Sequence, residues 1–252
     1  MALTPFDILN GVFNVIFLTI SFILGIIVLL KYFRNKNRNF IYIGLTIILL
    51  TSGWYGTTIS FLVALVTGGD GLTFSQIVLL NFMPLPVGLI FWMIAFTNFL
   101  YQDKQKIVLG IIIAITAFFY VVFLASLAIN PLIVGEKISP VDTKGNSVFL
   151  LSYIVIFILI VAISGIKFAL ETMKFDAPET KLKGKLLLIA FPMFSITGLL
   201  DSSFPSNELT LIIFRILLIL SMFLFYGGFI LPDWMRVIFL KDKNKREEYK
   251  EI

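Results

Sequence analysis

Long apolar runs separated by short charged segments make up most of this chain. A helix needs about 20 apolar residues to cross the hydrocarbon core of a bilayer. Six runs reach that length, and a seventh does so only if lysines extend toward the interface at one end and Asp201 lies near the interface at the other. We therefore predict an all-α integral membrane protein, a seven-transmembrane helix bundle. The expected spans are about 8–30, 40–66, 74–101, 107–129, 148–170, 183–204 and 208–232.

The composition agrees with a membrane protein and restricts its chemistry. Hydrophobic residues make up 59% of the 252 residues and charged residues only 14%, whereas about a quarter of a soluble domain is charged. The chain has no Cys and no His. The common ligands of zinc and haem and the usual general base at neutral pH are therefore missing. We expect no enzyme activity, no cofactor and no metal site.

The basic residues predict how the bundle is oriented. The seven spans place 17 of the 20 Lys and Arg residues on one side of the membrane, leave Lys137 and Lys144 on the other, and put Arg215 within a span. Lys and Arg are enriched in cytoplasmic loops. We predict a multi-pass protein of the plasma membrane with its N-terminus outside and its C-terminus in the cytoplasm. The net charge of +5 then reflects topology, and we expect no nucleic-acid binding.

Two parts are expected along the chain. Residues 1–232 form the transmembrane domain, whose first run has no signal-peptide features and should remain as a span. Residues 233–252 form a short cytoplasmic amphipathic helix and a charged tail. The one long outer loop, residues 130–147, contains Pro and Gly and is either a lid or a passive connector.

Arg215 is the most unusual residue within a predicted span. It lies seven residues after Glu208, so about 10 Å along the helix and inside the hydrocarbon core. A charge at that depth is costly and usually faces the bundle interior. Three interpretations remain open: an ion pair with Asp201, or less easily with Glu208; binding of an anion or carboxylate; or extension toward the outer headgroups.

Other polar and aromatic residues are expected at similar depth, in the outer half or near the midplane. Each alone is explained by an interhelical hydrogen bond or an interface position, but together with a charge they favour a pocket. The predicted ligand-binding residues are Arg215, Asp201, Asn81, Trp54, Tyr55, Tyr153 and Asn14.

Prolines predict where the helices are irregular. Pro84 and Pro86 each remove a backbone donor, so the third span should bend or open near Leu80 and Phe82. Pro192 and the Gly227–Gly228 pair are further possible bending points. Such breaks either shape the bundle or form a cavity wall or hinge.

Two well-known seven-helix classes do not fit. A retinal protein needs a lysine in its last helix, where this chain has Arg215, so no retinal is expected. G-protein-coupled receptors carry an acidic-Arg-aromatic triplet after the third helix and an Asn-Pro-x-x-Tyr motif in the seventh. Here the corresponding segments read TNFLYQDK and FYGGFILPDW.

A closer likeness is carried by NRNFIYIGLTIILLTSGWYGT, FMPLPVGLIFWMIAFTNFLYQDK and KLKGKLLLIAFPMFSITGLL. Over residues 7–232 the chain resembles the seven-transmembrane sensor region of microbial membrane histidine kinases, although no kinase domain follows the last span in this sequence. The resemblance implies a stand-alone, receptor-like sensor that binds a small ligand in the outer half of the bundle. It also implies signalling through a partner protein at the cytoplasmic face.

Two other functions remain open at this point. The bundle is alternatively a small-solute transporter or an accessory transport subunit, although we find no internal repeat between its first and last three spans. The second alternative is a structural partner subunit that binds no ligand.

Overall fold

The computed structural model describes residues 3–203 and 207–240. Within these residues, seven helices or helix pairs are long and apolar enough to cross a membrane: Pro5–Asn35, Asn39–Thr67, Phe74–Leu100, Gln102–Ile129, Val148–Met173, Pro178–Ser202 and Glu208–Phe229. The predicted seven-transmembrane bundle is thereby confirmed. The sixth span is longer than expected, because its helix begins at Pro178, before the lysines, and not at residue 183.

The elements run in chain order as α1 (Pro5–Asn35), α2 (Asn39–Leu50), the 3₁₀ turn η1 (Thr51–Trp54), α3 (Tyr55–Thr67), α4 (Phe74–Phe82), α5 (Pro84–Leu100), η2 (Gln102–Lys104), α6 (Gln105–Ile129), α7 (Pro131–Val134), β1 (Gly135–Ser139), β2 (Asp142–Gly145), α8 (Val148–Met173), α9 (Pro178–Ser203), α10 (Glu208–Phe229) and α11 (Asp233–Leu240).

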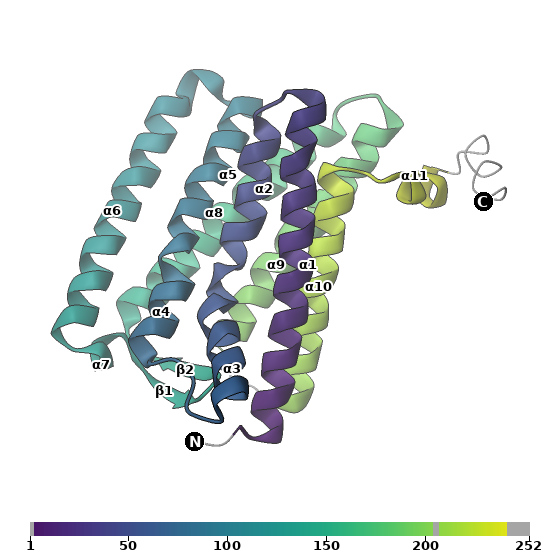
Figure 1. The fold of residues 1–252 in the computed structure, drawn as a ribbon. Coiled ribbons are helices and arrows are strands. Elements are labelled where there is room, and N and C mark those ends of the chain that lie inside the picture. Colours follow the sequence, from purple (N-terminus) through teal and green to yellow (C-terminus); the bar gives the residue numbers. More distant parts are fainter. Residues whose placement is uncertain (1–2, 204–206, 241–252) are drawn as a thin grey trace.

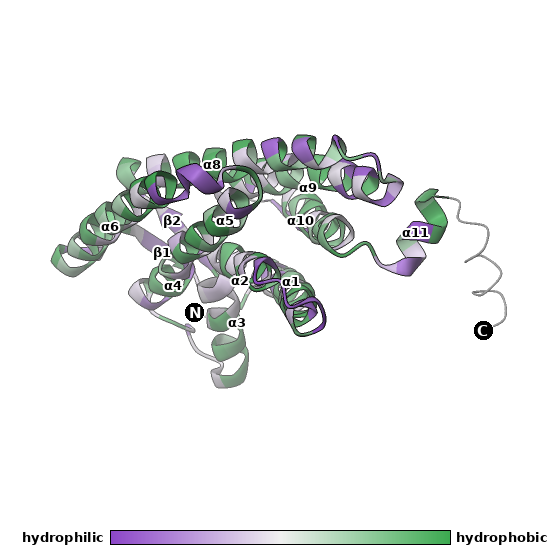
Figure 2. Ribbon diagram, turned by 90° about the horizontal axis from the view of Figure 1, so that it is seen from above, coloured by the Kyte–Doolittle hydropathy of each residue, from purple (hydrophilic) through white to green (hydrophobic). Residues whose placement is uncertain are grey.

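Six of the spans close into a ring around an apolar core. Helix α1 packs on α2 and α10, α2 on α5, α5 on α8, α8 on α9, and α9 on α10. Helix α6 lies at the edge of the bundle against α5, as Figures 1 and 2 show. It is also the span with the smallest buried share, so most of its surface is available to lipid.

The second span is broken at its middle, which the sequence analysis did not predict. The helix changes to a 3₁₀ turn at Thr51–Trp54. Hydroxyl groups satisfy backbone carbonyls around the break: Thr51 donates to the Ile48 carbonyl at 2.8 Å, and Thr58 donates to the Trp54 carbonyl at 2.7 Å. Residues that bond locally to the backbone, next to a glycine, weaken a regular helix. The residues of the segment TSGW therefore indicate a break in the helix.

The third span divides where its prolines predicted, with α4 ending at Phe82 and α5 beginning at Pro84. Neighbouring hydroxyls bond to carbonyls at this break: Tyr120 donates to the Met83 carbonyl at 2.5 Å, and Ser52 donates to the Asn81 carbonyl at 2.9 Å. A membrane helix tolerates such a break only where protein or water satisfies the backbone.

The other two proposed bending points lie within uninterrupted helices, α9 at Pro192 and α10 at Gly227–Gly228. The two glycines have a different role. A Cβ at Gly227 would lie 2.5 Å from the Met235 sulfur, and one at Gly228 would lie 2.4 Å from Leu187 Cγ. They allow α10 to approach α9 and α11 closely.

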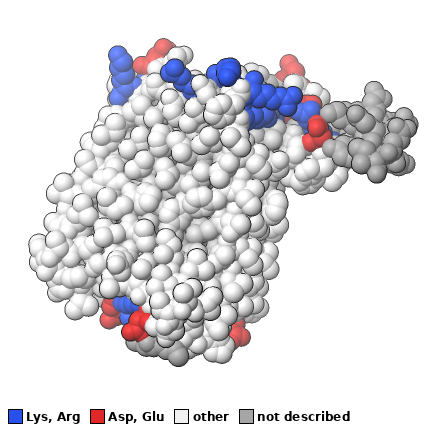
Figure 3. Space-filling view, viewed as in Figure 1, with Lys and Arg blue, Asp and Glu red and all other residues white. Residues whose placement is uncertain are grey.

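Residues 130–147 differ from a plain loop. They form the short helix α7 and an antiparallel hairpin of β1 and β2, in which Gly135 pairs with Gly145. We call this end of the bundle, where the N-terminus also lies, the hairpin end (Figure 1). The opposite end carries most of the described Lys and Arg side chains, as Figure 3 shows, and we call it the basic end.

Helix α11 extends sideways from the basic end (Figure 1). Met235 is buried against Leu186 and Leu231, whereas Trp234, Ile238 and Phe239 are exposed. This arrangement agrees with the predicted amphipathic helix at the membrane surface. The charged tail expected after it, from residue 241, lies outside the described residues.

The charge bias predicts that the hairpin end faces outward. Because the natural chain has no Cys, Lys144→Cys in the hairpin and Asp176→Cys between α8 and α9 each provide a single thiol on a well-exposed side chain. A membrane-impermeant maleimide should label Lys144→Cys in intact cells and Asp176→Cys only after permeabilisation. The reverse pattern would contradict the predicted orientation.

Candidate functional site

Arg215 forms a buried ion pair near the hairpin end. Its Nη1 donates to Asp201 Oδ2 at 2.8 Å, and both side chains are less than a tenth exposed. Arg215 comes from α10 and Asp201 from the end of α9. The pair predicted from depth is therefore present, and Arg215 does not extend toward the headgroups. A buried pair of this kind is stable only when further hydrogen bonds satisfy its remaining atoms.

Two asparagines of α1 extend this pair into a network. Arg215 Nη2 donates to Asn10 Oδ1 at 3.2 Å, and Asn14 Nδ2 donates to the same oxygen at 3.2 Å. Asn10 and Asn14 are one helical turn apart, so they lie on the same face of α1. The network joins the first helix of the chain to the last two spans.

Trp54 links the network to the broken second span. Its Nε1 donates to Asp201 Oδ2 at 2.8 Å, and its ring lies 5.8 Å from the Arg215 guanidinium carbon. A cation at this distance from an indole ring is attracted by its π electrons. The ring also packs edge-on against Phe17 at 5.0 Å. The break at η1 therefore places an aromatic donor beside the ion pair.

A cavity of about 430 Å³ opens beside this network, within the range of about 300–1,000 Å³ that small-molecule sites occupy. Arg215, Asp201, Asn10, Asn14 and Trp54 line one part of it. Aromatic and aliphatic side chains of α4, α5, α8 and α9 line much of the rest, among them Phe74, Val78, Phe82, Leu85, Phe157, Val161 and Phe194.

The hairpin contributes to the same cavity, since Val141, Asp142 and Thr143 belong to its lining. The hairpin is tied to α1 by Ser139 Oγ, which donates to Asp7 Oδ1 at 2.6 Å. It is tied to the α3–α4 loop by Lys137, whose Nζ donates to the Leu72 carbonyl at 2.6 Å. Of the two predicted roles for this loop, this geometry favours the lid.

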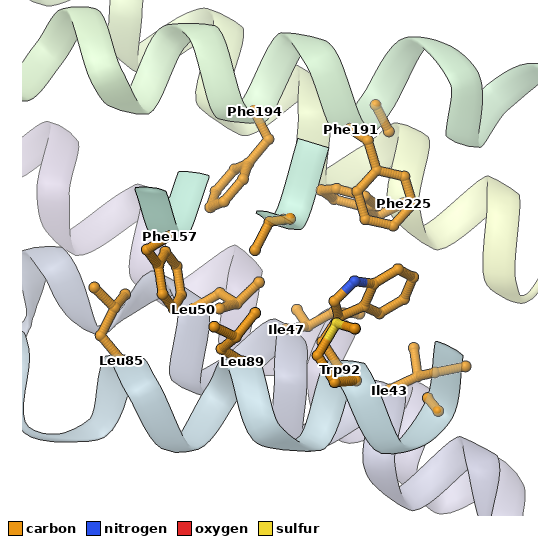
Figure 4. Close-up of a cluster of buried hydrophobic side chains, with 14 of the residues drawn as sticks. Ile43, Ile47, Leu50, Leu85, Leu89, Trp92, Phe157, Phe191, Phe194 and Phe225 are labelled. Atoms are coloured by element: carbon orange, nitrogen blue, oxygen red, sulfur yellow. The ribbon is translucent and has the colours of Figure 1, made fainter. Parts of the chain in front are cut away.

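Apolar side chains close the cavity on the side toward the basic end. Trp92 is 1% exposed, and its ring centroid lies 4.9 Å from that of Phe191, which lies 4.8 Å from that of Phe225. Figure 4 shows these three rings beside the cavity-lining Leu50, Leu85, Phe157 and Phe194. Trp92 Nε1 is anchored on Ser164 Oγ at 2.7 Å. The packing leaves a space of only about 20 Å³ at this level.

Five of the seven predicted site residues line this cavity: Arg215, Asp201, Asn81, Trp54 and Asn14. Asn81 is held by its Oδ1, which accepts from the Gly56 amide at 2.6 Å. Their role in binding a ligand remains a prediction.

Tyr55 and Tyr153 are not among the lining residues. Tyr55 packs against Phe22 at 5.5 Å and donates to the Ile48 carbonyl. Tyr153 stacks on Phe119 at 3.8 Å, between α8 and α6.

Several polar residues of the lining are absent from the predicted site, among them Asn10, Asp142 and Ser195. The spacing of Asn10 and Asn14 was a usable signal, because residues four apart share a helix face. Asp142 had no such signal, since only the folded hairpin brings it to the cavity. Burial is the main cause that raises the pKa of Asp142 above its ordinary value, and the nearby Asp201 and Asp7 carboxylates add to it.

Three buried polar atoms on the cavity lining have no hydrogen-bond partner in the described structure: Asn14 Oδ1, Ser195 Oγ and Arg215 Nε. Buried polar groups are normally paired, so these atoms are available for hydrogen bonds to a molecule in the cavity. No three acidic side chains among the described residues lie close enough to hold a metal ion. The arrangement can therefore bind a small polar molecule through hydrogen bonds and charge.

Comparison of the chain with protein-family models, with curated proteins and with solved structures finds no match.

The ion pair should carry a large part of the stability at the hairpin end. Arg215→Gln and Asp201→Asn each leave one partner buried without its counter-charge, and such changes cost about 3–5 kcal/mol. Because the two residues interact directly, the double variant should lose less than the sum of the single losses. Thermal melting of the detergent-solubilised variants measures these losses of stability.

Arg236→Gln at the basic end is the matched control. Arg236 also forms ion pairs, but it is more exposed than Arg215, so its loss should cost about 1 kcal/mol or less. Equal melting of the wild type and the Arg215 and Asp201 variants would show that the pair does not stabilise the fold.

Proposed function

We propose that this protein is a receptor-like membrane sensor that binds a small ligand in the cavity at its hairpin end. In this proposal the hairpin end faces outward from the plasma membrane, as the positive charge of the basic end favours. Ligand binding then alters the contacts at the basic end, where a partner protein reads the change. The resemblance to the sensor region of microbial histidine kinases, judged on sequence, is consistent with this role.

Two observations support the proposal: the cavity is lined by unpartnered polar atoms, and packed side chains close it toward the basic end. On its lining, Asn14 Oδ1, Ser195 Oγ and Arg215 Nε have no hydrogen-bond partner within residues 3–203 and 207–240. The packed rings of Trp92, Phe191 and Phe225 separate it from the basic end. Many transporters are built from internal repeats that rock against each other around a midplane site, and the first and last three spans of this chain show no such repeat. This favours a sensor over a transporter, and the unpartnered atoms favour a ligand-binding role over a purely structural one.

A route for the signal exists in the packing of α9 and α10. These helices carry Asp201 and Arg215 at the hairpin end. At the basic end, Gly227 and Gly228 hold α10 against Met235 of α11 and Leu187 of α9. A ligand that changes the ion pair therefore acts on the same two helices that support α11. Closely packed interfaces of this kind respond by discrete shifts of one element against another.

Filling the cavity should abolish ligand binding without unfolding the protein. A Cβ at Gly53, which lines the cavity, meets no atom within 4 Å. Gly53→Leu should therefore extend into the open space. Small amines, carboxylates and sugars can be screened by thermal shift on the purified wild-type protein. Compounds that stabilise the wild type should fail to stabilise Gly53→Leu.

Gly110→Leu is the control, because Gly110 also has nothing within 4 Å but lies on the exposed face of α6. It should respond to each compound as the wild type does. Equal responses in wild type and Gly53→Leu would contradict binding in this cavity. Uptake of a stabilising compound into proteoliposomes, blocked by Gly53→Leu, would support the transporter instead.

A further inference from the structure

Acidic side chains outnumber basic ones around the cavity. Its lining contains the carboxylates of Asp142 and Asp201 and the guanidinium of Arg215. Arg215 is already paired with Asp201 at 2.8 Å. Asp142 accepts at Oδ1 from the Thr143 amide at 2.8 Å. Among the described residues it forms no ion pair with a cation of the lining, and Arg215 acts on it only as a nearby charge, with a smaller effect than burial. The cavity wall thus carries one net negative charge.

The other cations of the hairpin are directed elsewhere. Lys137 Nζ donates to the Leu72 carbonyl at 2.6 Å, and Lys144 lies 4.0 Å from Glu136 on an exposed part of the hairpin. Neither belongs to the lining. Asp7, which accepts from Ser139, adds a further carboxylate nearby. A cavity lined by one sign of charge in a low-dielectric surrounding attracts ligands of the opposite sign.

The hydrogen bonds leave acceptors free on the same wall. Asn10 Oδ1 accepts from Arg215 and from Asn14 Nδ2. Asn14 therefore turns its own Oδ1 away from this bond, and that buried atom has no partner. Asp201 accepts from Trp54 and from Arg215 on Oδ2 alone. Free acceptors of this kind require N–H or O–H donors, and a primary ammonium group supplies three.

Resting on the function proposed above, we infer that the ligand class is an organic ammonium compound with an apolar, aromatic-sized body. The ammonium group pairs with Asp142 and with the free acceptors near Asn14. The body lies among the aromatic residues of the lining, Trp54, Phe74, Phe82, Phe157 and Phe194. Aromatic rings also attract cations through their π faces.

The alternative occupant, an anion held by Arg215, fits less well. Arg215 already donates from Nη1 to Asp201 and from Nη2 to Asn10, and among the described residues Nε is its one nitrogen without a hydrogen-bond partner. The anion would also approach Asp201 and Asp142. Burial raises the pKa of Asp142, and the nearby Arg215 guanidinium offsets this only in part, so an ammonium ion at closer range would favour the ionised carboxylate.

Three probes of matched shape test the ligand class on the purified full-length protein: phenethylammonium, 2-phenylethanol and phenylacetate. They place a cation, a neutral group and an anion on the same ring. Phenethylammonium should raise the melting temperature in a saturable way, and the other two should not. Asp142→Asn should raise the half-saturating amine concentration by about tenfold or more, because a desolvated charge partner is lost.

Asp142→Glu keeps the charge and should keep the response, so loss of response in Asp142→Asn does not reflect misfolding. Asp176→Asn, on a side chain exposed between α8 and α9, is the matched control and should leave the response unchanged. Absence of a phenethylammonium response, or a response unaffected by Asp142→Asn, would overturn the inference. If phenylacetate stabilises the wild type and Gly53→Leu abolishes that effect, the cavity binds ligands and only the ammonium class is wrong.

Discussion

Burying Arg215 within the hydrocarbon core costs free energy that the surrounding helices must offset. They do so with Asp201 at 2.8 Å, with Asn10 at 3.2 Å and with the face of the Trp54 ring. These partners come from α1, η1 and α9, so the guanidinium, which belongs to α10, fixes the relative positions of four elements. The polar side chains of this network do not pack as closely as the apolar side chains around Trp92, and the cavity lies beside them.

The two ends of the bundle differ in how closely their side chains pack. Toward the basic end, rings such as Trp92 and Phe191 pack directly, and glycines such as Gly165 let them approach: a Cβ there would lie 2.2 Å from the Phe191 ring. Toward the hairpin end, the breaks at η1 and before Pro84 expose backbone groups that hydroxyls must satisfy. Regular packing therefore closes the bundle toward the basic end, whereas the irregular backbone leaves a polar cavity toward the hairpin end.

The sequence predicted the bundle well because the apolar length of a span depends on the bilayer alone. The Arg215–Asp201 pair was one of three interpretations left open, and it could be named because depth along a helix follows from residue number. The direction in which a side chain points around its helix was harder to predict. Trp54 and Tyr55 are consecutive and so point about 100° apart, and only Trp54 faces the cavity. Tyr153 lies on a helix that is apolar all round, where no pattern selects the inner face. Asp142 reaches the cavity through the hairpin, whose position is set by tertiary contacts and not by a local sequence pattern.

The proposed function requires a cavity at the buried ion pair that opens outward and is closed toward the basic end, and thiol accessibility tests this most directly. Ser195 is 4% exposed and lines the cavity, whereas Thr116 on α6 is 5% exposed and does not. In this Cys-free chain, a small membrane-impermeant quaternary-ammonium thiol reagent should modify Ser195→Cys from outside. It should modify neither Ser195→Cys from the cytoplasmic side nor Thr116→Cys from either side. Modification of Ser195→Cys from the cytoplasm, or protection from both sides, would contradict the account.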